Sequence, residues 1–255
     1  MKPAPPYLAG LRVIAERMPS DGDYPFCLPF VRNLDLTISS AVSIFVGENG
    51  SGKSTLLEAI AVLSRLPVSG GARADLGAGH APAERSALAD VLRPSFRRRP
   101  RDGYFLRAEF QAHFASLLDA RAADPEFRGS GNPYALYGGK SLHCRSHGEA
   151  FLAVIQSRFE EGLFLLDEPE AALSPQRQLV LLAQMHALVE AGAAQFLIAT
   201  HSPILMTYPD AELVSFDDPA LPSVNLEETS HFQITRGMLE NPARYWKHLR
   251  NREPG

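Results

Sequence analysis

One nine-residue stretch decides the fold class, and it reads Gly47-Glu48-Asn49-Gly50-Ser51-Gly52-Lys53-Ser54-Thr55. It matches the phosphate-binding pattern G-x-x-x-x-G-K-[ST] at every fixed position. The β-branched run over residues 42–46 predicts a buried strand before the loop, and the apolar spacing over residues 54–66 predicts a helix after it. A strand, a glycine-rich loop and a helix in this order predict a P-loop nucleotide-binding fold.

The residue types in this loop suit the binding of nucleotide phosphates. Glycines let the backbone curl with its N–H groups pointing inward, and the following helix adds its N-terminal dipole at the same point. We expect Lys53 to reach the β- and γ-phosphates and the Ser54 hydroxyl to bind Mg²⁺. The loop alone does not distinguish kinases, GTPases and ATPases.

The second half of the chain alternates between expected helices and strands. Helices are expected over residues 148–160 and 175–190, and strands over residues 163–166 and 195–199. Strands that alternate with helices form a sheet with parallel strands. The expected fold is therefore α/β with a mixed sheet, in a single domain over residues 1–255.

Other segments give weaker patterns. Strands are expected over residues 31–38, 104–110 and 213–216, a short helix near residues 84–92, and a terminal helix over residues 237–250.

The composition changes between residues 67 and 145, where Gly, Ala, Arg and Pro are frequent. We expect an inserted, partly helical, lid-like segment there. The interval is too short and too rich in Gly and Pro for a long coiled-coil arm.

Bulk composition sets limits on the class of protein. The chain has 255 residues, of which 45% are hydrophobic and 21% are charged, as in soluble globular proteins. The formal net charge of -4 gives no overall sign of nucleic-acid binding. Cys27 and Cys144 are far apart, which argues against a disulfide framework and favours a cytoplasmic location. No signal peptide or membrane span is expected.

Two acids, Asp167 and Glu168, follow the apolar run over residues 163–166. A buried strand would bring Asp167 to the carboxyl edge of the sheet, where open α/β folds bind ligands. We expect Asp167 to hold Mg²⁺ and Glu168 to polarise the attacking water. Adjacent carboxylates after a strand also occur as helix caps or turns, but the phosphate loop in the same chain favours the catalytic interpretation.

At this point the chain resembles the ABC-type ATPase superfamily, over about residues 24–205. The run Asp167-Glu168-Pro169-Glu170-Ala171-Ala172-Leu173-Ser174-Pro175 is similar to a Walker B segment that continues into a D-loop. The resemblance implies that residues 172–174 face a partner subunit. Thr200-His201-Ser202-Pro203 resembles the switch segment, which implies that His201 contacts the γ-phosphate and the attacking water. An isolated histidine at a strand end is more often structural, but its order in the chain favours the switch role.

The segment Ser146-His147-Gly148-Glu149 resembles the signature motif L-S-G-G-[QE], with Arg145 in place of the leucine and His147 in place of the first glycine. The resemblance implies that Ser146 and Gly148 bind the γ-phosphate held by an opposite subunit, in an ATP-sandwiched homodimer. Ser146 and Glu149 also fit a capping box, and the two roles are compatible.

Two positions that the superfamily uses stay open. Glu109 and Gln111 are both candidates for the Q-loop residue that binds Mg²⁺. Tyr24 and Phe26 are both candidates for the aromatic residue that stacks on adenine, and either suits the core equally well.

Residues 170–175 and 200–206 resemble the AAA-type ATPases related to RecF-like and SMC-like heads, as a small stand-alone member. Those relatives act on DNA in repair or defence, so the resemblance implies DNA as a candidate partner. The only concentrated basic run, Arg97-Arg98-Arg99-Pro100-Arg101, suits contacts to phosphates, although such runs are usually only solvated.

The combined prediction is Mg²⁺-dependent hydrolysis of ATP, with Lys53, Glu168 and His201 as the catalytic residues. Two alternatives stay open. One is the ATP-binding subunit of an ABC transporter, and the other is a slow ATP-gated dimerisation switch for an unknown protein partner.

Overall fold

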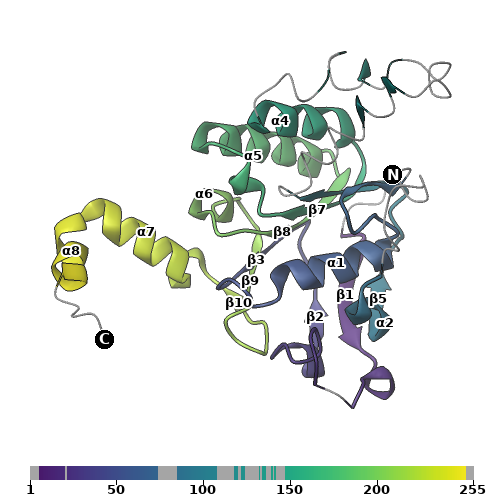
Figure 1. The fold of residues 1–255 in the computed structure, drawn as a ribbon, viewed down its shortest axis with the longest axis horizontal. Coiled ribbons are helices and arrows are strands. Elements are labelled where there is room, and N and C mark those ends of the chain that lie inside the picture. Colours follow the sequence, from purple (N-terminus) through teal and green to yellow (C-terminus); the bar gives the residue numbers. More distant parts are fainter. Residues whose placement is uncertain are drawn as a thin grey trace.

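The computed structural model describes residues 6–20, 22–73, 85–107 and 147–250, together with 118–119, 122–123, 132, 134–135, 139 and 141. Figure 1 shows a body built around a central sheet, from which a pair of C-terminal helices projects. Among the residues described, no helix combines the length and apolarity that a bilayer crossing requires.

A seven-stranded mixed sheet, in the order β10-β9-β3-β8-β7-β6-β4, forms the centre of the body. Its five inner strands pair in parallel. These strands are β3 (Val42–Val46), β6 (Gly103–Arg107), β7 (Gly162–Asp167), β8 (Ala194–Ala199) and β9 (Glu212–Ser215). At the two edges, β4 (Gly71–Ala72) and β10 (Ser223–Val224) pair antiparallel.

A second, antiparallel sheet has three strands in the order β2-β1-β5. They are β1 (Leu8–Val13), β2 (Asp35–Thr37) and β5 (Leu92–Phe96). The helices that position the candidate site are α1 (Lys53–Ser64), α4 (His147–Arg158), α5 (Pro175–Glu190) and α6 (Pro203–Met206).

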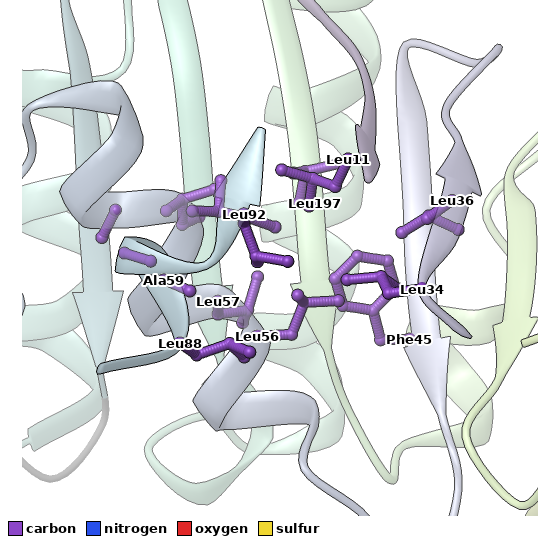
Figure 2. Close-up of a cluster of buried hydrophobic side chains, with 14 of the residues drawn as sticks. Leu11, Leu34, Leu36, Phe45, Leu56, Leu57, Ala59, Leu88, Leu92 and Leu197 are labelled. Atoms are coloured by element: carbon purple, nitrogen blue, oxygen red, sulfur yellow. The ribbon is translucent and has the colours of Figure 1, made fainter. Parts of the chain in front are cut away.

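The inner strands are buried on both faces, so their side chains alternate between two hydrophobic cores. Phe45 and Leu197 point into the core that α1 and the small sheet cover (Figure 2). Ile44 and Ile198 point into the opposite core, which α4 and α5 cover. Burying each of these side chains contributes about 2 kcal/mol, which holds the sheet between two helical layers.

The parallel register brings the carboxyl ends of the inner strands to one edge. Arg107 lies opposite Asp167, Asp167 lies opposite Ala199, and Ala199 lies opposite Phe45. The residues that follow these strands therefore form a row along the edge, where open α/β folds bind their ligands.

Several expected elements are confirmed, including the strand over residues 42–46 and the helix over residues 175–190. The strand expected over residues 31–38 is wrong in its first half, because Val31–Asn33 forms a 3-10 helix and only Asp35–Thr37 pairs as β2.

The terminal helix expected over residues 237–250 is also wrong. The structure has two helices, α7 (Ser230–Glu240) and α8 (Pro242–Arg250). Pro242 explains the break, because proline cannot donate a backbone hydrogen bond inside a helix but suits the first helical position.

The interval of residues 67–145 contains parts of both sheets. The helix expected near residues 84–92 is the short α2 (Ala87–Asp90), and Leu92 already begins β5. β5 pairs with β1, and β6 lies between β4 and β7 in the central sheet. These two strands belong to the core of the fold rather than to a lid.

Candidate nucleotide-binding site

The phosphate loop connects β3 to α1 at the carboxyl edge of the central sheet. Gly47, Gly50 and Gly52 have φ angles of 144°, 80° and 97°, a region that favours glycine. A Cβ atom on Gly52 would also lie 2.7 Å from Cε1 of Phe30 and 2.8 Å from Cδ1 of Leu28. The curl of the loop and its packing on the core therefore both require glycine at Gly52.

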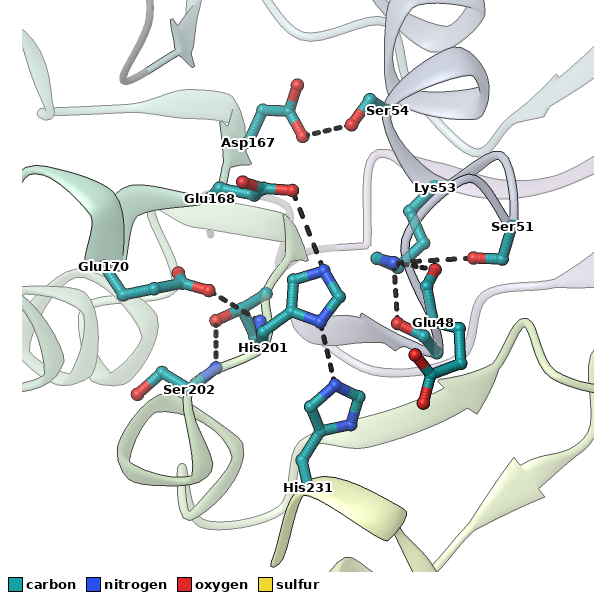
Figure 3. A network of polar contacts seen from close by, with 12 residues as sticks. Glu48, Ser51, Lys53, Ser54, Asp167, Glu168, Glu170, His201, Ser202 and His231 are labelled. Atoms are coloured by element: carbon teal, nitrogen blue, oxygen red, sulfur yellow. Dashed lines mark hydrogen bonds and ion pairs between the residues drawn. The ribbon is translucent and has the colours of Figure 1, made fainter. Parts of the chain in front are cut away.

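Lys53 lies folded over the loop and is only 4% exposed. Its Nζ atom donates hydrogen bonds to the carbonyl oxygens of Gly47 at 2.7 Å and Glu48 at 2.8 Å, and to Oγ of Ser51 at 3.4 Å (Figure 3). Burial lowers the pKa of Lys53, and nearby carboxylates oppose the shift. All three hydrogen-bond acceptors are neutral, so an anionic phosphate would be a stronger partner for this ammonium.

Ser54 and Asp167 meet beside the loop. Oγ of Ser54 donates to Oδ1 of Asp167 at 2.8 Å, and Asp167 is 6% exposed. Burial raises the pKa of Asp167, while the bond from Ser54 and the charge of Arg107 oppose the shift. A hydroxyl and a carboxylate in contact are oxygen ligands that suit Mg²⁺. The two residues therefore fit the metal-binding role expected from the sequence.

Arg107 is a charged partner of this pair that the sequence analysis missed. Its Nε atom lies 3.3 Å from Oδ2 of Asp167, and its Nη1 atom lies 2.8 Å from Oε1 of Glu58 on α1. The Arg107 side chain is 12% exposed, so it links α1 to β7 in a partly desolvated setting. Arg107 lies beside Asp167 because β6 pairs with β7 in this register. The sequence alone does not reveal which strands are neighbours, so it gave no signal for Arg107.

Glu168 and His201 lie on the more open side of the edge. Glu168 has a left-handed φ of 48°, and its side chain is 46% exposed, against 7% for Asp167. The left-handed turn directs the two neighbouring carboxylates to different environments. Nε2 of His201 lies 3.7 Å from Oε1 of Glu168, which is too far for a hydrogen bond. The two side chains would have to move closer together to form one.

His201 is held by groups other than Glu168. Its backbone N–H donates to Oε1 of Glu170 at 2.6 Å, and its Nδ1 atom lies 2.8 Å from Nε2 of His231. Its Nε2 atom is buried and has no hydrogen-bond partner within the described part of the chain. Burial lowers the pKa of His201, and the positive charge of Lys53 adds to the shift. The imidazole is therefore neutral at pH 7.

A buried network fixes the segment that carries His201. Oγ of Ser202 donates to Oε1 of Gln178 at 2.6 Å, and Nε2 of Gln178 donates to the carbonyl oxygen of Leu173 at 3.1 Å. Burial raises the pKa of Glu170, whereas the hydrogen bonds that its carboxylate accepts act to lower this pKa. The switch segment and the D-loop segment are thus tied to each other through α5.

Asp217 is a second residue that the sequence analysis missed. Its Oδ1 atom accepts a hydrogen bond from the backbone N–H of Glu48 at 2.8 Å, which anchors the phosphate loop. Asp217 follows β9, the parallel neighbour of β3. An acid at the end of the apolar run over residues 213–216 was the available signal, since all parallel strand ends meet at this edge.

The two aromatic candidates for adenine stacking have different surroundings. Tyr24 is 67% exposed, and its hydroxyl shares a hydrogen bond with Oγ1 of Thr55 in the first turn of α1. Phe26 is half-buried and packs against the core beneath α1. Of the two, only Tyr24 presents its ring to solvent beside the loop.

Of the two candidate signature residues, the structure describes Gly148. Gly148 is buried at the start of α4, where a Cβ atom would lie 2.9 Å from the carbonyl oxygen of Ala172 and 2.2 Å from Nη1 of Arg177. Gly148 thus packs against the D-loop segment. Ser146, Glu109 and Gln111 fall outside the described residues.

Two family models match separate parts of the chain. A family model described as "AAA domain, putative AbiEii toxin, Type IV TA system" matches residues 149–207, and a second, described as "AAA domain", matches residues 26–64. No curated protein matches the sequence significantly.

Solved structures share the fold at low sequence identity. An ATP-binding cassette of an ABC transporter is 14% identical, with 94% of this chain and 97% of that chain covered and a TM-score of 0.50. An SMC head domain from Thermotoga maritima is 14% identical, with 86% of this chain and 99% of that chain covered and a TM-score of 0.44. Two AAA-domain models match separate parts of the chain, and the cassette shares its fold, so the expected P-loop α/β fold of ABC-head type is confirmed.

Proposed function

We propose that this protein binds ATP and hydrolyses it to ADP and phosphate in a Mg²⁺-dependent reaction. One observation carries the proposal. The side chains of Lys53, Ser54, Asp167, Glu168 and His201 come from three separate segments of the chain and converge at one edge of the sheet (Figure 3).

Each residue has a role that its environment supports. Lys53 and the loop N–H groups bind the phosphates, and Ser54 and Asp167 hold Mg²⁺. The metal, when bound, neutralises phosphate charge. Glu168 is half-exposed, so it can orient a water molecule for in-line attack on the γ-phosphorus, and the bond to the bridging oxygen of ADP breaks. His201 contacts the γ-phosphate and this water. Tyr24 stacks on adenine.

We further propose that a second copy of the chain completes the site. Gly148 and Ala172 lie next to each other, so the start of α4 and the D-loop form one continuous surface. In the proposed dimer it faces the ATP bound by the other copy, as the resemblance to ABC-type heads implies.

DNA is the proposed partner of the ATP cycle, and a basic row supports it. Arg93, Arg97, Arg99 and Arg101 are all exposed, and they alternate along β5 and the segment that follows it. β5 is an edge strand of the small sheet, so the row lies on its rim. Four exposed guanidinium groups along one strand and the segment after it suit the phosphates of a nucleic-acid backbone.

Phosphate release by the purified protein tests these proposals. ATP turnover should require Mg²⁺. Double-stranded DNA should increase the turnover rate at low salt, and this stimulation should disappear at moderate salt. Replacing Arg97, Arg99 and Arg101 by alanine should abolish the stimulation. The matched control replaces three exposed arginines elsewhere, Arg32, Arg236 and Arg244. Equal loss in both triple variants, or Mg²⁺-dependent turnover indifferent to DNA, would overturn the DNA proposal and favour a transporter subunit or a protein-gated switch.

A further inference from the structure

A second imidazole, His231, lies beside the switch histidine. It is the second residue of α7, thirty positions after His201, and it belongs to no motif. Its Nε2 atom lies 2.8 Å from Nδ1 of His201, and the ring centroids are 4.9 Å apart. Figure 3 shows Glu168, His201 and His231 in a line, with the His201 ring between the other two side chains.

This geometry leaves two arrangements of one proton. Either Nδ1–H of His201 donates to His231, or Nε2–H of His231 donates to Nδ1 of His201. The first arrangement would turn the bare Nε2 lone pair of His201 toward the Glu168 carboxylate, which can only accept hydrogen bonds. The second turns an N–H donor toward that carboxylate, 3.7 Å away. Electrostatics therefore favours His231 as donor and His201 as acceptor.

The surroundings support a defined tautomer. Burial and the charge of Lys53 lower the pKa of His201, so the choice lies between two neutral forms. Thr229 caps the start of α7 by accepting a hydrogen bond from the N–H of Phe232 at 3.3 Å, which stabilises the first turn, where His231 lies. α7 also contacts α6, the short helix that follows His201 in the chain.

We propose that His231 is a positioning residue that holds His201 as the Nε2–H tautomer, so that the proton faces Glu168 and the reacting groups. His231 acts only through His201 and does not touch substrate. The inference rests on the proposed function for its effect on turnover, but the tautomer itself exists without ATP. Because His231 belongs to α7, which projects with α8 from the body (Figure 1), an element outside the P-loop core supports the switch.

A substitution series tests the effect on turnover. His231→Gln keeps an N–H donor near the position of Nε2 and should retain kcat within about threefold of wild type. His231→Leu removes the donor and should lower kcat by about tenfold or more, with KM within about twofold, as for other residues that orient a functional imidazole. His231→Glu offers only an acceptor and should be no better than His231→Leu. Thr235→Leu, on the exposed face of the same helix, is the control and should match wild type.

Nitrogen-15 NMR of the imidazole groups reads the tautomer without any turnover, with the His201 signals assigned from a His201→Gln variant. Wild type should show a protonated Nε2 and a bare Nδ1, and His231→Leu should shift both signals. A protonated Nδ1 with a bare Nε2 in wild type would overturn the proposal, as would an unchanged kcat in His231→Leu when wild type hydrolyses ATP. A wild-type protein without turnover would contradict the proposed function but leave the NMR test of His231 intact.

Discussion

The candidate site has two halves that differ in how completely they are formed. The binding half consists of Lys53, Ser54 and Asp167, which are joined to their neighbours by hydrogen bonds of 2.7–2.8 Å. The catalytic half consists of Glu168 and His201, whose side chains lie 3.7 Å apart. Glu168 is 46% exposed, whereas Lys53 and Asp167 are buried. In this structure the binding half is formed, whereas the proposed reaction would require Glu168 and His201 to come closer together.

The largest expected effect is a loss of turnover without a loss of ATP binding, which would separate the catalytic half from the binding half. Glu168→Gln should lower kcat by about 1,000-fold, because the amide cannot accept the proton that the attacking water loses. The Kd for ATP should stay within about threefold, because among the described residues Glu168 forms no hydrogen bond or ion pair with Lys53 or Ser54. Phosphate release and a nucleotide titration measure the two quantities. Glu227→Gln, an exposed acid away from the site, is the control.

Arg107 tests how far the binding half depends on buried charge. Arg107→Leu leaves the buried Asp167 carboxylate without its cation, which should cost about 3 kcal/mol of unfolding free energy. Arg12→Leu breaks an exposed Arg–Asp pair, with side chains 70% and 60% exposed, and should change stability by less than about 1 kcal/mol. Denaturant unfolding of both variants makes the comparison. Equal losses would contradict the role assigned to burial.

Lys53 tests the binding half directly. Lys53→Ala should weaken ATP binding by about 100-fold, because hydrogen bonds from a charged group to phosphate contribute about 3 kcal/mol. A fluorescent ATP analogue reports the affinity. An unchanged Kd would show that the ammonium stays on the loop carbonyls and does not turn to the phosphates.

The smallest expected effect concerns Glu170, whose carboxylate accepts a hydrogen bond from the backbone N–H of His201. Burial raises its pKa above the ordinary value of 4.5, so the folded state binds the proton more tightly than the unfolded state. The contribution of Glu170 to stability should therefore be fully present below pH 4.5 and be lost as pH rises through its raised folded-state pKa. Glu170→Gln lacks the titrating group but keeps an acceptor for the His201 N–H. Its Tm should gain on that of wild type as pH rises, and parallel Tm curves would contradict the prediction.

The two halves also differ in how far the sequence reveals them. Lys53 and Ser54 follow from a local motif, because the loop geometry needs its glycines at fixed spacing. Asp167 and Glu168 follow from an apolar strand that ends in two acids, whereas the role of His201 comes from the resemblance of residues 200–203 to a switch segment. The strand alternation likewise predicts the central sheet, since residues 163–166 and 196–199 are apolar throughout.

Arg107, Asp217 and His231 could not be identified in the same way. Arg107 and His231 reach the site through the register of two strands and the start of a distant helix, which no local pattern encodes. Asp217 offered only an acid at the end of an apolar run, and its contact with the phosphate loop depends on the pairing of β9 with β3. Long-range pairing therefore decides the role of these three residues.

The identity of the nucleotide that stays bound after incubation with ATP and Mg²⁺ tests the division of the site most directly. The protein is separated from free nucleotide, and its bound nucleotide is resolved by chromatography. The account predicts that wild type holds ADP, Glu168→Gln holds intact ATP, and Lys53→Ala holds neither. ADP formed by Glu168→Gln at the wild-type rate, or ATP held by Lys53→Ala at the wild-type level, would contradict it.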